Sequence, residues 1–296
     1  MNKIFNKDNQ SKIFLGTWRM GGDIETNPDN DDKKDIEAIK YAISKGISHI
    51  DTSESYAAGK TELLISEAVK NFNRNKIFIA TKVRESNLSY NGIIHSCMKS
   101  LERLNIEYID LYYIHKQNPN ASIVDITSAL NELMDKGLIK HVGLSNVGIE
   151  TIKKYSRLLK KPIYAVQNQY NLVCRESQKK GIIDYCKKND IKFISWRPIL
   201  LSYPEAVDPH YRTGAYKLLD KVAKKYNKSN TQIVAKWLLQ QDGVSIVFKS
   251  SNKKHIDEIL DANSFTLSEF DWNVLDKCFP VQRDVGCTAN EYFEVV

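Results

Sequence analysis

Apolar residues along the chain follow two alternating patterns. Short runs of β-branched and aromatic residues alternate with longer stretches in which apolar residues recur every three or four positions, as at Ile36, Ile39 and Ile43. The first pattern is typical of buried β-strands and the second of amphipathic helices. The predicted strands are Lys12–Leu15, Ser48–Asp51, Ile77–Thr81, Asp110–Ile114, His141–Leu144, Tyr164–Gln167, Lys192–Trp196 and Ser245–Phe248.

This alternation indicates an α/β fold in which right-handed crossovers build a parallel sheet. Such a sheet either stays open or closes into a barrel. An open dinucleotide-binding sheet carries a G-x-G-x-x-G turn after its first strand, and the sequence contains no such motif. Eight strand–helix units in 296 residues match a closed (β/α)8 TIM barrel. We therefore expect a single barrel domain over residues 1–296.

Two long segments interrupt the regular alternation. One runs from Arg197 to about Thr213, and the other from about Val281 to Val296. Loops of this length are usually functional, and the active sites of TIM barrels lie at the C-terminal face of the strands. We expect both segments to be loops that cover a substrate at this face.

The charge of the chain narrows the choice of partners. The formal net charge is +7, which suits an anionic partner such as a cofactor phosphate. The lysines are spread over predicted helix faces, as at Lys33-Lys34 and Lys153-Lys154, and no basic stripe with interleaved aromatic residues occurs. Nucleic acid is therefore not an expected partner.

Cysteine use and hydropathy indicate the compartment. The five cysteines are scattered and odd in number, so we expect no disulfide framework and a reducing, cytoplasmic location. No apolar run approaches the roughly 20 residues of a membrane span. The histidines and cysteines also lack the spacing of metal ligands, and no metal is expected.

Polar or aromatic side chains follow the predicted strands where each one ends. These residues are Asp51, Lys82, His115, Ser145-Asn146, Gln167, Trp196 and Lys249-Ser250. Because consecutive strands are neighbours in the barrel, we expect Asp51, Lys82 and His115 to meet at one mouth. Tyr56 reaches the same place from the loop after the second strand.

These four side chains suit the reduction of a carbonyl group, which needs a hydride on carbon and a proton on oxygen. A tyrosine with its usual pKa of about 10 is a weak acid, but a nearby cation favours the phenolate. Lys82 can be that cation, held in place by Asp51, and His115 can orient the carbonyl oxygen. The hydride requires a nicotinamide cofactor, because side chains do not supply one.

The chain resembles the aldo-keto reductase family over nearly its whole length, from about Lys12 to Phe279. The matching stretches are Gly46–Tyr56 (GISHIDTSESY), Ala80–Lys82 (ATK), Asp110–His115 (DLYYIH), Val142–Asn146 (VGLSN), Gln167–Asn171 (QNQYN) and Gly16–Trp18 (GTW). The resemblance implies an NADPH-dependent oxidoreductase that reduces an aldehyde or ketone. Tyr56 would donate the proton, Lys82 and Asp51 would tune it, and His115 would position the carbonyl.

The resemblance also implies a set of cofactor contacts. The amide end of the nicotinamide would meet Ser145, Asn146 and Gln167, with Trp196 stacked on the ring. The first strand end, Gly16, Thr17 and Trp18, would line cofactor and substrate. The phosphate and adenine end would meet Lys249, Ser250, His255 and Glu258.

Three positions depart from the family pattern. Arg197 stands where a serine is usual, and an arginine there can reach the pyrophosphate, a carboxylate substrate or solvent. His255 replaces the arginine that grips the 2′-phosphate, and Ile259 replaces an asparagine near the adenine. A neutral histidine offers neither the permanent charge nor the fork of arginine, so NADH remains possible beside NADPH.

Several of the residues proposed to bind the cofactor also have an ordinary structural explanation. Ser145-Asn146 can cap the following helix, Trp196 can belong to the core, and Lys249-Ser250 can begin a capped helix. A second function on the same barrel also stays open, namely a nicotinamide-sensing regulatory or interaction subunit with slow chemistry. A glycosidase-like or lactone-hydrolysing site would need paired carboxylates across the mouth, and only Asp51 is well placed.

Overall fold

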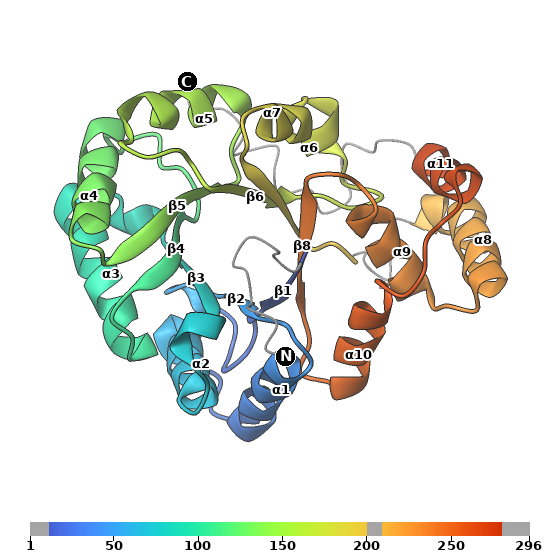
Figure 1. The fold of residues 1–296 in the computed structure, drawn as a ribbon, viewed down its shortest axis with the longest axis horizontal. Coiled ribbons are helices and arrows are strands. Elements are labelled where there is room, and N and C mark those ends of the chain that lie inside the picture. The colour runs from blue at the N-terminus through green and yellow to red at the C-terminus, as the bar shows by residue number, and fades with distance from the viewer. Residues whose placement is uncertain (1–11, 200–208, 280–296) are drawn as a thin grey trace, which may run out of the picture.

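The computed structural model describes residues 12–199 and 209–279, except for the side chains of residues 209–215. Eight parallel strands close into a barrel in chain order, and the last strand pairs with the first (Figure 1). The strands are β1 (Ile13–Gly16), β2 (His49–Asp51), β3 (Phe78–Val83), β4 (Ile109–Ile114), β5 (Ile139–Ser145), β6 (Ala165–Gln169), β7 (Lys192–Trp196) and β8 (Val244–Lys249). The prediction of a closed (β/α)8 barrel is confirmed.

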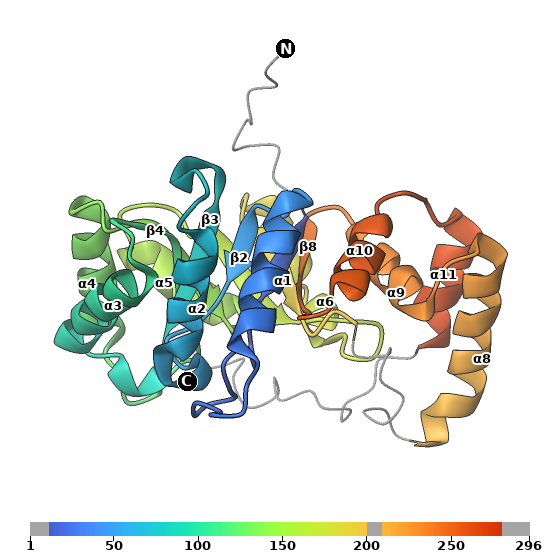
Figure 2. The same ribbon diagram turned by 90° about the horizontal axis from the view of Figure 1, so that it is seen from below.

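Helices surround the barrel on its outer side (Figures 1 and 2). They are α1 (Asp32–Ser44), α2 (Lys60–Val69), α3 (Tyr90–Leu104), α4 (Ile123–Asp135), α5 (Ile149–Leu158), α6 (Glu176–Lys179), α7 (Ile182–Lys188), α8 (Pro209–Tyr226), α9 (Asn230–Leu239), α10 (Lys253–Asp261) and α11 (Glu269–Cys278). Helices α8 and α11 lie side by side outside α9, where the Tyr226 hydroxyl donates to Asp271 at 2.6 Å.

The structure corrects the extent of one predicted loop. Helix α8 begins at Pro209, so the last five residues of the segment predicted as a loop from Arg197 to about Thr213 are helical. A proline at the start of a helix costs no hydrogen bond, because the first amides of a helix have no partner within it. The rest of this loop from residue 200, and the tail from Val281, lie outside the described residues, so their role as substrate cover stays a prediction.

Local sequence signals explain where the helices begin. The Ser229 side chain accepts a hydrogen bond from the Gln232 amide, and the Gln232 side chain accepts one from the Ser229 amide, so α9 begins with a capping box. The Ser89 side chain caps α3 in a similar way, and Asn252 caps α10. Each cap satisfies amides that the helix itself leaves unpaired.

The barrel interior is filled by large side chains opposite small ones. Tyr113 on β4 is fully buried in the interior cluster with Phe14, Ile194 and neighbouring residues. Its partner in the sheet register is Gly143 on β5. A Cβ atom on Gly143 would lie 2.3 Å from the Tyr113 Cε1 atom. A glycine is therefore required at this position to leave room for the ring.

Two further observations concern the compartment. No helix within the described part of the chain is both long and apolar enough to cross a membrane. Cys174, at the end of the segment after β6, is disulfide-bonded. This bond differs from the prediction, because spacing along the sequence does not show which cysteines the fold brings together. The cytoplasmic location stays a prediction.

We expect the substitution Gly143→Ala to destabilise the barrel by roughly 1–3 kcal/mol, since an added methyl group must displace the Tyr113 ring. Urea unfolding followed by circular dichroism measures this loss. The control is the same substitution in a Tyr113→Val background, where the ring is absent. An equal loss in both backgrounds would show that the contact between Gly143 and Tyr113 is not the cause.

Candidate active site

A buried ion pair lies at the C-terminal mouth of the barrel. The Lys82 amine on β3 is 2.6 Å from the Asp51 Oδ1 atom at the end of β2, and it also donates to the Thr52 carbonyl at 2.7 Å. The Gln167 side chain on β6 donates to the other Asp51 oxygen at 2.8 Å. Lys82 is 1% exposed and Asp51 is 3% exposed. Both charges are therefore paired and hydrogen-bonded, as buried ions require.

Tyr56 and His115 lie beside this ion pair. Their rings meet edge to face, with centroids 5.9 Å apart, and the Lys82 amine lies 5.4 Å from the centroid of the Tyr56 ring. The structure therefore brings together the four residues that the sequence predicts as catalytic. Their roles stay predictions.

The loop that carries Tyr56 has an unusual backbone. Ala57 and Ala58, in the 3₁₀ turn Tyr56–Gly59 (η1), both have positive φ angles, of 48° and 51°. Their amides donate to the carbonyls of Asp23 and Ile24, each at 2.7 Å. Non-glycine residues rarely adopt this conformation, which tends to occur at functional sites. The contacts with the β1–α1 loop hold Tyr56 in place, and no sequence signal announces them.

Ser53 is a site residue that the sequence analysis missed. Its hydroxyl lies 3.1 Å from the His115 Nδ1 atom and 3.4 Å from the Lys82 carbonyl oxygen. This contact engages one ring nitrogen of His115 and leaves Nε2 as the nitrogen available to a substrate. Ser53 stands between Asp51 and Tyr56 in the matched motif, which was the only available signal.

Withdrawal from water raises the pKa of the Tyr56 hydroxyl, and the nearby Asp51 charge acts in the same direction. The Lys82 charge lowers this pKa, as the sequence predicts, but it does not outweigh the effect of burial. In this structure the pKa of Tyr56 therefore lies above its ordinary value, so the phenol carries its proton at neutral pH.

The other two groups keep defined charge states. Burial lowers the pKa of Lys82, but the Asp51 carboxylate and the Tyr56 hydroxyl together more than compensate, so the pKa of Lys82 is raised and its amine stays charged. Burial, together with the positive charge of Lys82, holds the pKa of His115 well below its usual range. The mouth thus holds an ammonium, a neutral phenol and a neutral imidazole.

The predicted amide-binding residues lie next to this set. The Asn146 side chain donates to the His115 carbonyl at 3.0 Å, and its oxygen accepts from the Trp196 indole at 3.1 Å. Ser145 donates to the backbone of Gln167 at 2.8 Å. Trp196 is half-buried rather than part of the core. Asn146 and Ser145 do not cap α5, because Gly148 is its N-cap residue.

At the end of β1, Gly16 and Thr17 are buried and have structural contacts, whereas Trp18 is partly exposed. Thr17 is fully buried and donates to the Asp51 carbonyl from its hydroxyl at 2.9 Å, so it supports β2. A Cβ atom on Gly16 would lie 3.0 Å from the Val247 side chain, which explains the glycine. Trp18 is half-buried, and its indole donates to Asp23 at 2.9 Å.

The predicted phosphate-binding residues lie around the start of α10. The Lys249 amine donates to Ser251 at 2.9 Å, and the Ser250 hydroxyl donates to the Asn252 carbonyl at 3.2 Å. His255 is exposed. Lys249 and His255 can therefore reach an anion outside α10, while Ser250 shapes the turn before the helix.

The adenine end differs from the predicted pattern in its local contacts. Glu258 is half-buried and accepts a hydrogen bond from Ser229, the residue that caps α9. Ile259 is 1% exposed and belongs to the core. The structure therefore gives Glu258 a role in joining α10 to α9, and its contact with an adenine stays a prediction.

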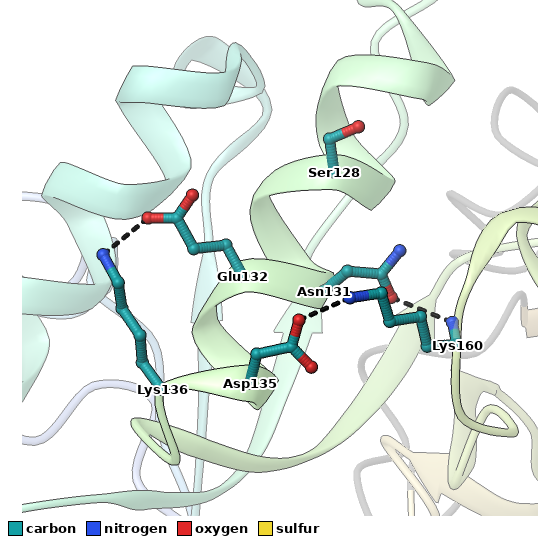
Figure 3. A pocket seen from close by; sticks show the side chains of 6 residues that line it. All are labelled: Ser128, Asn131, Glu132, Asp135, Lys136 and Lys160. Carbon is teal, nitrogen blue, oxygen red and sulfur yellow. Dashed lines mark hydrogen bonds and ion pairs between the residues drawn. The ribbon is translucent and has the colours of Figure 1, made fainter.

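A shallow hollow of about 490 Å³ lies beside α4, and none of the candidate active-site residues lines it (Figure 3). It is lined by Ser128, Asn131, Glu132, Asp135, Lys136 and Lys160. Its lysines are paired with its carboxylates, Lys136 with Glu132 and Lys160 with Asp135. It lies at the C-terminal end of α4, and therefore near the start of β5 rather than at the mouth.

Within the described residues, no cluster of three metal-ligating side chains occurs.

Comparisons with known proteins agree with this geometry. The model of the aldo/keto reductase family matches residues 12–279. A glyoxal reductase from Bacillus subtilis is 32% identical, over 86% of this chain and 87% of its own. The crystal structure of the thermostable aldo-keto reductase Tm1743 has a TM-score of 0.85 and 31% identity, over 90% of this chain and 95% of its own.

A further solved structure shows the same fold at lower identity. The aldo-keto reductase from Klebsiella pneumoniae, in complex with NADPH, has a TM-score of 0.83 and 22% identity, over 94% of each chain. The family match covers nearly all of the described residues, from β1 to the end of α11. This chain is therefore a member of the aldo/keto reductase family.

Proposed function

We propose that this protein reduces an aldehyde or ketone to the alcohol with NADPH, and that Tyr56 donates the proton. The observation that carries the proposal is the buried Lys82–Asp51 ion pair beside the edge-to-face rings of Tyr56 and His115. Membership of the family supports carbonyl reduction in general. The assignment of roles to these residues follows from their chemistry.

Each residue has one task in the proposed reaction. When bound, NADPH would supply the hydride to the carbonyl carbon. The Tyr56 hydroxyl gives its proton to the carbonyl oxygen, and the Lys82 ammonium stabilises the phenolate that remains. Asp51 keeps Lys82 charged and in position. The neutral His115 ring orients the carbonyl through its Nε2 atom.

The residues at the mouth fit a nicotinamide dinucleotide. Trp196 presents a half-buried indole next to the side-chain amide of Asn146. The indole can stack on the nicotinamide ring, and the amide can form hydrogen bonds with the carboxamide of that ring. Lys249 and the exposed Lys253, Lys254 and His255 suit its phosphates. The Klebsiella pneumoniae relative of the same fold was solved with NADPH. A small aldehyde is the substrate class proposed, in line with the glyoxal reductase among the relatives.

We expect Tyr56→Phe to lower kcat by at least about 100-fold, since the proton donor is lost. Stopped-flow measurement of NADPH oxidation with an aromatic aldehyde checks this. Tyr113→Phe is the matched control, because its ring lies 5.7 Å from the Lys82 amine and its hydroxyl has no described hydrogen-bond partner. The Tyr113 variant should keep kcat within about threefold.

Retained turnover in Tyr56→Phe would remove Tyr56 as proton donor. If the wild-type protein oxidised no NADPH above background with any aldehyde or ketone, although it bound the cofactor, the nicotinamide-sensing alternative would be favoured. Quenching of tryptophan fluorescence measures that binding separately, because Trp18 and Trp196 lie at the mouth.

We expect kcat/KM for reduction to be independent of pH between about pH 6 and 9, and to fall above about pH 10. Reduction needs the protonated phenol, and the raised pKa of Tyr56 keeps it protonated across this range. The lowered pKa of His115 keeps its ring neutral over the same range. Steady-state assays at constant ionic strength check this. A change in kcat/KM near pH 6.5 that disappears in His115→Gln would show instead that the pKa of His115 is that of an ordinary histidine.

We expect His255→Arg to tighten NADPH binding by about tenfold and to leave NADH binding unchanged. A guanidinium is permanently charged and binds a phosphate through two hydrogen bonds, whereas a neutral histidine does neither. Fluorescence titration with both cofactors measures the two Kd values. An equal change for NADPH and NADH would place His255 away from the 2′-phosphate.

A further inference from the structure

Arg197 has a fixed backbone at the mouth of the barrel. It directly follows β7 and has a positive φ angle of 50°, a conformation that costs free energy for residues other than glycine. The buried Asn171 side chain donates to the Arg197 carbonyl at 3.0 Å. The departure from regular strand geometry is therefore held by a specific contact, and it determines where the side chain points.

The Arg197 guanidinium lies between two indole rings. Its central carbon is 5.4 Å from the centroid of Trp18 and 5.4 Å from that of Trp196. Cation–π contacts of this kind hold a guanidinium in place, but they do not neutralise its charge. The side chain is half-buried, so bulk water compensates only part of that charge.

The remaining charge of Arg197 has no acidic partner within the described residues, since no carboxylate lies within ion-pair distance of it. The other half-buried or buried arginines of the described residues are each paired with a carboxylate, namely Arg74 with Asp110, Arg84 with Glu54, Arg103 with Glu62 and Arg175 with Asp276. The neighbouring Arg19 is paired with Asp23. Burial and the charge of Arg19 both lower the pKa of Arg197, and a bound anion would offset both effects.

Arg197 is connected to His115, one of the proposed catalytic residues, through three successive contacts. Trp196, which its guanidinium touches, donates to Asn146 at 3.1 Å, and Asn146 donates to the His115 carbonyl at 3.0 Å. The cations proposed for the cofactor phosphates stand elsewhere, after β8 and on α10. An anion on Arg197 would therefore share the mouth with the carbonyl that is being reduced.

We propose that Arg197 determines substrate specificity by binding a carboxylate carried by the carbonyl substrate. The planar guanidinium can donate two parallel hydrogen bonds to a carboxylate. The inference rests on the function proposed above, because it assigns a substrate class to that same site. The preferred substrates are then aldehydes or ketones that carry a carboxylate group, rather than neutral carbonyl compounds of the same size.

The test compares 4-formylbenzoate with its neutral methyl ester, which presents the same aldehyde on the same ring. We expect the wild-type full-length chain to prefer the carboxylate in kcat/KM. In Arg197→Gln the ratio of the two kcat/KM values should fall by about 10- to 100-fold, as expected for loss of a charged hydrogen bond. Arg197→Lys keeps the charge but loses the fork, and should recover part of the ratio.

Arg19→Gln is the matched control, because it removes one positive charge from the same mouth and also contacts the Trp18 ring. Its ratio should stay within about threefold of the wild-type ratio. An unchanged ratio in Arg197→Gln overturns the inference. So does an equal loss for both aldehydes together with a Kd for NADPH weakened about tenfold, because Arg197 would then bind a cofactor phosphate.

Failure of the proposed function is distinguished by a binding measurement. If neither aldehyde is reduced, calorimetric titration of the wild-type and Arg197→Gln proteins with 4-formylbenzoate and with the ester still measures recognition of the carboxylate. Tighter binding of 4-formylbenzoate, lost in the variant, supports the anion site. Equal binding of both compounds by the two proteins overturns it.

Discussion

The mouth of the barrel depends on one buried ion pair between Lys82 and Asp51. Removing an ammonium and a carboxylate from water costs several kcal/mol per ion unless both are paired and fully hydrogen-bonded. Three strands meet that requirement together, since β2 supplies Asp51, β3 supplies Lys82, and β6 supplies the Gln167 amide that satisfies the second carboxylate oxygen. The result is a fixed positive charge that faces a tyrosine and a histidine.

The barrel determines why this pair can form at all. Closing eight parallel strands brings the ends of β2, β3 and β6 to one face, although Asp51 and Gln167 are 116 residues apart. Below the ion pair, Tyr113 fills the interior against Gly143. This packing excludes water from beneath Lys82, and the low polarity strengthens every electrostatic interaction above it. Stability and chemistry therefore use the same interior side chains.

The two positive charges at the mouth, those of Lys82 and Arg197, differ in how they are compensated. Lys82 is compensated internally by Asp51 and acts on Tyr56, which keeps its proton because burial outweighs the lysine. Arg197 is held by indole rings and by the Asn171 contact to its backbone, without a carboxylate partner among the described residues. A compensated cation can tune a neighbouring group, whereas an uncompensated one is suited to bind a ligand.

The sequence by itself determined the class of fold, the order of the strands and the residues that gather at the mouth. Short runs of β-branched and aromatic residues located all eight strands, because the strands of a parallel barrel are largely buried on both faces and this burial is recorded in residue type. Asp51, Tyr56, Lys82 and His115 followed from their places near strand ends, since strands that are consecutive in the chain are neighbours in this barrel.

Only the tertiary structure decided which groups touch and how strongly each is buried. The contact of Gln167 with Asp51, that of Ser53 with His115, the net direction of the Tyr56 pKa and the disulfide at Cys174 were all beyond the sequence. The physical reason is that hydrogen bonds, desolvation and charge pairing depend on distances of a few ångströms between distant segments. Residue type and spacing along the chain do not fix such distances.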